Sequence, residues 1–175
     1  MNGTTAARTV LAVALVLTGL VLQLTVLARL PLPFGGTPDL LLLVVASFGF
    51  LRGPVVGMAV GFGAGLLLDL APPGDSPAGL WALVLCVVGF LAGNVSDDVD
   101  RSTAAPLVLV AGLTLLEVVL FAGLSALLGS PRVTWSGLAG VGLSTAAYTV
   151  VLAPFVVPLI MRLDRRVEPD GAPRW

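Results

Sequence analysis

Residues 53–70, GPVVGMAVGFGAGLLLDL, decide how this chain folds. The stretch is apolar enough to lie in a lipid bilayer, yet it has glycine at positions 53, 57, 61 and 65 and aspartate at position 69, at every fourth position. In an α-helix, residues spaced in this way lie one turn apart and about 40° from each other around the axis. The stretch therefore predicts a membrane helix with one slowly winding face that lacks side chains and ends in a carboxylate.

The glycines of this predicted helix need a compensating contact. Each one costs a helix about 1 kcal/mol relative to alanine in water. In lipid, the usual compensation is the close approach of a second helix backbone. Gly57, Gly61 and Gly65 are therefore the expected surface for a close helix contact, either within this chain or with a partner protein.

The composition of the chain points to a membrane protein. Of the 175 residues, 57% are hydrophobic and 11% are charged, whereas soluble domains average about 25% charged residues. A chain this short and apolar cannot hide most of its surface as a soluble globule. The net charge of −1 offers no basic patch for a nucleic acid.

Hydropathy predicts an all-α polytopic membrane protein, a bundle of six transmembrane helices that forms a single domain over residues 1–175. The spans are expected at residues 9–28, 38–51, 54–71, 78–95, 105–129 and 137–161, with a cytoplasmic tail at 162–175. The run at 38–51 would be about 21 Å long, which is short for a hydrocarbon core of about 30 Å, so we expect a thin or partly re-entrant span. Arg52-Gly53-Pro54 predicts a tight hairpin.

The sequence Thr37-Pro38-Asp39 has the pattern of a helix start. A hydroxyl at the N-cap, proline at the first helical position and an acid in the first turn are each favourable there. We therefore expect Thr37 to cap the helix and Asp39 to lie in its first turn.

The distribution of arginines predicts the orientation in the membrane. Six spans place both termini on one side, and that side would carry seven of the nine arginines: Arg8, Arg52, Arg101, Arg162, Arg165, Arg166 and Arg174. The other side would carry Arg29 and Arg132. The positive-inside rule then predicts a multi-pass protein of the cytoplasmic (inner) membrane with both termini in the cytoplasm.

Three charged residues fall at one level on this topology, near the outer interface. They are Arg29, Asp39 and Asp69. Charges in lipid pair or face the bundle interior, which predicts a cluster with Arg29 between the two aspartates. The alternative is that each side chain reaches separately toward the headgroups.

Glu117 lies near the centre of the expected span at residues 105–129. A central acid costs about 2.5–3.5 kcal/mol on insertion scales and should face a partner or a wet cavity. The candidates are Gln23, Ser144, Thr145 and Tyr148, or protonation of Glu117 itself. A site for coupling protons or ions and a hydrogen bond that joins helices both stay open, and we prefer the second.

The sequence contains no pattern of catalytic residues. Histidine is absent and all nine cations are arginine, so nothing is present to activate a serine or the single cysteine in the usual way. The glycines are not followed by the Lys-Ser/Thr pair of a phosphate-binding loop. We expect no enzyme activity, no cofactor and no metal.

Four stretches, in their order and spacing, resemble the rod shape-determining protein MreD family. They are Pro38-Asp39-Leu-Leu-Leu-Leu, Arg52-Gly53-Pro54, Gly57-x3-Gly61-x3-Gly65-x3-Asp69-Leu70 and Pro77-x-Gly79-Leu80. The resemblance implies a non-catalytic membrane scaffold of the cell-elongation (rod) complex that supports cell shape and peptidoglycan synthesis by binding MreC. It also implies MreB, RodA and a class B penicillin-binding protein as partners in a larger complex, and it leaves a homodimer open.

The six-span architecture is also similar to the substrate-binding subunits of energy-coupling-factor vitamin transporters. The alternative function is therefore that of a substrate-binding subunit for a small solute. Such a protein needs an outward-facing pocket with several convergent polar or aromatic groups. The seven phenylalanines, three tryptophans and one tyrosine of the chain are few for that purpose.

Overall fold

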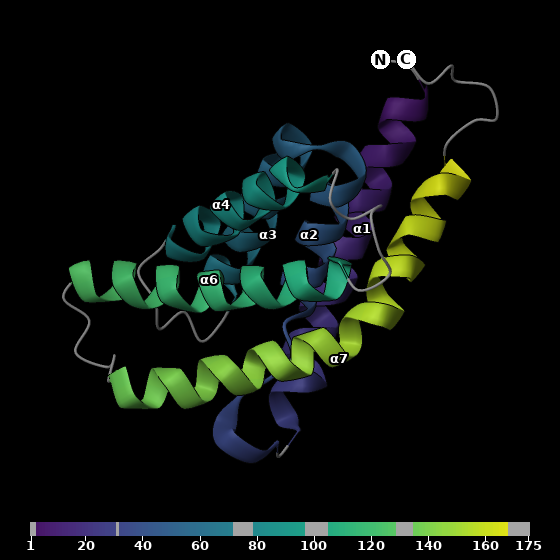
Figure 1. Ribbon diagram of the computed structural model, residues 1–175. Helices are drawn as coiled ribbons and strands as arrows, with labels where there is room; N and C mark the ends of the chain where they lie inside the picture. The colour runs from purple at the N-terminus through teal and green to yellow at the C-terminus, as the bar shows by residue number, and fades with distance from the viewer. Residues whose placement is uncertain (1–2, 31, 72–78, 97–104, 129–134, 168–175) are drawn as a thin grey trace.

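The computed structural model describes residues 3–30, 32–71, 79–96, 105–128 and 135–167, and within them all regular structure is helical. The α-helices are α1 (Gly3–Thr25), α2 (Leu40–Arg52), α3 (Pro54–Leu70), α4 (Leu80–Asn94), α6 (Ala105–Leu127) and α7 (Trp135–Val167) (Figure 1). Two short 3-10 helices, η1 (Leu27–Arg29) and η2 (Pro33–Gly35), lie between α1 and α2. The all-α fold class is thereby confirmed.

Helix length separates the helices into two groups. The segments Ala6–Arg29, Ala105–Leu127 and Gly140–Val167 are long and apolar enough to cross a membrane. Their outer faces expose large apolar side chains, such as Val10 on α1 and Phe155 on α7, which is stable in lipid. The apolar helices α2, α3 and α4 are shorter, with 13, 17 and 15 residues. The described helices therefore support a membrane protein, and the count of six crossings stays a prediction.

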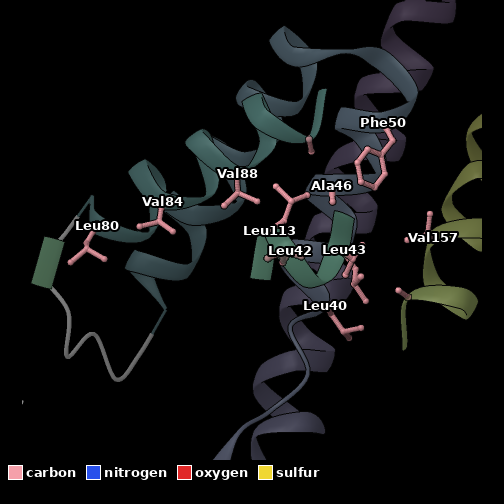
Figure 2. Packing of buried hydrophobic residues seen from close by; sticks show 13 residues of the cluster. Leu40, Leu42, Leu43, Ala46, Phe50, Leu80, Val84, Val88, Leu113 and Val157 are labelled. Atoms are coloured by element: carbon pink, nitrogen blue, oxygen red, sulfur yellow. The ribbon is translucent and has the colours of Figure 1, made fainter. Parts of the chain in front are cut away.

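Helix α2 is the centre of the bundle. Its residues are buried without interruption from Leu40 to Phe50, so the helix is apolar on all sides and surrounded by protein. It contacts α1, α3, α4, α6 and α7. Figure 2 shows Leu42 and Ala46 of α2 in the same cluster as Val88 of α4 and Leu113 of α6.

The turn between α2 and α3 is a tight hairpin, as the sequence predicts. Gly53 has a φ of 82° and serves both as the C-cap of α2 and as the N-cap of α3. Pro54 then opens α3, where its missing N–H costs nothing. The left-handed φ explains why glycine stands at position 53.

The expected cap of α2 was wrong by two residues. Asp39 itself is the N-cap, and its carboxylate accepts the N–H of Leu42 at 2.8 Å. Thr37 and Pro38 therefore precede the helix. A carboxylate at the N-cap satisfies a free backbone N–H and also complements the helix dipole, which gives it an advantage over the threonine hydroxyl.

Helix α7 is long and bent (Figure 1). Pro154 and Pro158 lie inside it, and proline removes a backbone hydrogen bond and kinks a helix. The helix continues through Arg162 to Val167, so the first part of the segment expected as a tail is helical. The start of α1 and the end of α7 lie at the same end of the molecule in Figure 1.

Candidate functional site

The glycine face of α3, formed by Gly57, Gly61 and Gly65, is turned toward α4 inside the chain. A Cβ at these positions would collide with the backbone carbonyl oxygens of α4 residues, namely Gly89, Leu85 and Trp81 respectively. The two helix backbones are therefore in direct contact along about two turns.

Helix α4 contributes its own glycines to this interface. A Cβ on Gly89 would collide with the carbonyl oxygen of Gly57, and one on Gly93 would collide with the backbone of Pro54. The backbone of α4 thus approaches α3 as closely as α3 approaches α4. The face expected to contact a neighbour or a partner is occupied here by another helix of the same chain.

Asp69 ends the glycine face and caps helix α4. Its carboxylate accepts the backbone N–H groups of Gly79 and Ala82 at 3.0 Å and of Trp81 at 3.2 Å. Gly79, the N-cap of α4, has no side chain to cap the helix itself. Asp69 supplies that cap from the preceding helix and so joins the end of α3 to the start of α4.

The three charged residues of the expected interfacial cluster do not bind one another in the structure. Asp69 binds the start of α4, and Asp39 binds the start of α2. Arg29 is exposed in η1. Within the described residues, no ion pair joins Arg29 to either aspartate, because the backbone N–H groups of helix starts serve as the partners of both carboxylates.

Asp39 also belongs to a polar cluster at the centre of the bundle. Its carboxyl group interacts with the side chains of Glu117 on α6 and Gln23 on α1. Its backbone N–H donates to the Thr149 hydroxyl on α7 at 2.9 Å. We call Gln23, Asp39, Glu117 and Thr149 the central polar cluster; it joins the four helices α1, α2, α6 and α7.

The central polar cluster is shielded from solvent. Glu117 is 3% exposed, Asp39 is 8% exposed and Thr149 is fully buried. One oxygen of Glu117, Oε1, is buried and has no hydrogen-bond partner among the described residues. Gln23 uses its amide oxygen to accept the N–H of Leu41 at 3.0 Å, which leaves its NH2 group to donate.

Of the expected companions of Glu117, the structure brings Gln23 into the cluster. Ser144 bonds to carbonyl oxygens of its own helix, and the Tyr148 hydroxyl donates to the carbonyl oxygen of Pro33 at 3.1 Å. Asp39 and Thr149 are further members of the cluster that the sequence does not predict as neighbours of Glu117. The sign available in the sequence was the shortness of the run at 38–51, since a short helix begins inside the bundle rather than at its edge.

A second polar contact joins the α2–α3 turn to the end of α7. Arg52 forms a salt bridge with Asp164, and its Nε lies 3.3 Å from the other carboxylate oxygen. The guanidinium also lies over the ring of Phe48, 5.6 Å from the ring centroid, within the range of a cation–π interaction. The sequence places Arg52 in the hairpin and on the positive side of the membrane, but it does not predict this salt bridge.

These sites together use polar groups to join helices. The described residues contain no group of three or more His, Cys, Asp or Glu side chains that could hold a metal ion. Each buried carboxylate instead bonds to a backbone or side-chain group from a different part of the chain.

Comparison with known proteins identifies the family. The family model described as rod shape-determining protein MreD matches residues 4–167. No curated protein and no solved structure matches the chain. The match includes the glycine face, the Asp69 cap and the central polar cluster, and the chain therefore belongs to the MreD family of rod shape-determining proteins.

Proposed function

We propose that this protein is a non-catalytic membrane scaffold of the cell-elongation complex. Membership of the MreD family implies a role in rod shape determination. The finer proposal is that the chain supports peptidoglycan synthesis by binding MreC, with MreB, RodA and a class B penicillin-binding protein in the larger complex. The family match over residues 4–167 is the observation that carries this proposal.

The chemistry of the described residues is compatible with a scaffold. The carboxylates of Asp39, Asp69 and Asp164 bond within the chain, where they cap helices or pair with Arg52. The outer faces of α1, α6 and α7 are apolar and exposed. A protein of this kind would recognise its partners through its membrane faces and short loops.

The position of the glycine face indicates which surfaces of the bundle are free to bind MreC. Gly57, Gly61 and Gly65 are buried against α4. MreC would therefore bind to a different face of the bundle, and the glycines would support assembly by keeping α3 and α4 together.

The proposed location is the cytoplasmic membrane, with six crossings and both termini in the cytoplasm. The start of α1 and the end of α7 share one end of the molecule (Figure 1). Arg162, Arg165 and Arg166 are exposed at that end, as the positive-inside rule expects for a cytoplasmic face.

Two experiments test this function. One depletes the protein in its native host, and the other purifies a tagged copy from native membranes by affinity. We expect depleted cells to lose their rod shape and the tagged protein to retain MreC. Normal cell shape together with a small molecule bound to the purified protein would contradict the scaffold and support the alternative of a solute-binding transporter subunit.

A further inference from the structure

The central polar cluster contains two acids in contact, and among the described residues no cation lies beside them. The carboxyl groups of Asp39 and Glu117 interact with each other, and both are buried in the interior of the bundle. From the neighbouring helices, α1 contributes the amide of Gln23 and α7 the hydroxyl of Thr149. Arg52 lies at the other end of α2, where it is paired with Asp164.

The hydrogen-bond donors around the two acids are distributed unequally. Asp39 accepts the backbone N–H of Leu42 and interacts with the side chain of Gln23. Glu117 contacts the carboxyl group of Asp39, while its Oε1 has no partner among the described residues. A charged Glu117 would thus carry buried negative charge without a donor and in contact with another acid, which is a costly arrangement.

A proton removes this cost. Two buried carboxyl groups that interact with each other repel unless one of them holds a proton, and Asp39, which has the backbone donor, is the better place for the negative charge. We propose that Glu117 and Asp39 form a proton-binding site, in which Glu117 holds the proton and donates it to Asp39. The bound proton then links α6 to the start of α2.

The proposal goes beyond the scaffold function, because it makes the stability of the bundle depend on proton binding. When the proton leaves, two carboxylates face each other in a buried place and repel. The folded protein therefore loses stability as the pH rises, since the unfolded chain binds fewer protons at Glu117 than the folded chain does.

Thermal unfolding of the full chain in lipid nanodiscs, followed between about pH 5 and pH 9 in sodium-free choline buffer, tests the site. We expect the unfolding temperature of the unmodified protein to fall by several degrees as the pH rises. Glu117→Gln carries an amide that can donate to Asp39 at any pH, so its unfolding temperature should vary much less with pH. Asp69→Asn, a change at a buried acid outside the cluster, should keep the pH dependence of the unmodified protein.

Two results would overturn the proposal. One is an equal pH dependence in Glu117→Gln and in the unmodified protein. The other is an unfolding temperature at high pH that rises again when sodium chloride is added but not when choline chloride is added. The ligand of the site would then be Na⁺. Infrared difference spectra of the unmodified protein need no variant: the carbonyl band of a buried carboxylic acid should be present at neutral pH, and its absence would contradict the site.

Discussion

Asp69 shows how a single side chain can close a pair of helices. It lies buried at the end of α3 and accepts three backbone N–H groups from the start of α4. The first N–H groups of any helix have no partner inside the helix. Asp69 precedes residues 72–78 in the chain and its three partners follow them, so Asp69 helps to fix the position of the start of α4.

Replacement of Asp69 should weaken the fold. Asp69→Leu leaves the three N–H groups of α4 without an acceptor, at a cost of about 1–3 kcal/mol. Asp69→Asn keeps one oxygen acceptor and should lose less. Membrane abundance and the unfolding temperature in detergent measure the difference. A normally abundant Asp69→Leu protein with an unchanged unfolding temperature would show that the cap contributes nothing.

At the scale of elements, the bundle is held by the α3–α4 pair and by the central position of α2. The α3–α4 pair brings two backbones together along glycines that face each other. Helix α2 is covered on every side and fills the core between α4, α6 and α7. The Arg52–Asp164 salt bridge then fastens the α2–α3 turn to the end of α7.

Helix α3 contains a matched control for the glycine face, because Gly63 lies on the same helix but outside that face. A Cβ at Gly61 would collide with the backbone of Leu85, whereas a Cβ at Gly63 would meet nothing beyond its own helix backbone within 4 Å. We expect Gly61→Ala to separate α3 from α4 and to lower the unfolding temperature by several degrees. Gly63→Ala should be neutral or stabilise the helix by up to about 1 kcal/mol, because alanine favours helix.

Size-exclusion chromatography with heating compares the two variants directly. If Gly61→Ala unfolds at the same temperature as Gly63→Ala, close backbone contact is not what holds α3 and α4 together. If Gly61→Leu folds normally but no longer retains MreC, the glycine face binds a partner rather than α4.

At the scale of the whole molecule, the chain is a bundle with apolar outer faces and polar groups directed inward. Among the three helices long enough to cross a membrane, the first has the fewest buried residues. In its most apolar stretch 11% of the residues are buried, against 28% in α6 and 33% in α7. Helix α1 therefore exposes the most surface to lipid or to other membrane proteins. The central polar cluster is enclosed by the helices around it.

The orientation of the bundle can be measured at its ends. With six crossings and both termini in the cytoplasm, a reporter fused after Trp175 that is active only in the cytoplasm should be active, and one active only outside should be silent. The same reporter placed after Leu128 should give the opposite result, since that turn is expected outside. A signal from the outside reporter at Trp175 would refute the topology.

The sequence alone determined that the chain is an all-helical membrane protein. Apolar runs, Gly53-Pro54 and the glycine spacing carry this information locally, because helix formation in lipid depends on nearby residues. The resemblance to the MreD family also rested on the sequence, through the order of short stretches around Asp39, Arg52 and Asp69.

Only the tertiary structure decided which residues meet. Asp39 was expected beside Arg29 and Asp69, yet it contacts Glu117, a residue far away along the chain. Asp39 at the start of the 13-residue helix α2 meets Glu117 in the middle of the 23-residue helix α6. Depth in a bundle depends on how helices of unequal length pack against one another, and no local pattern in the sequence contains that information.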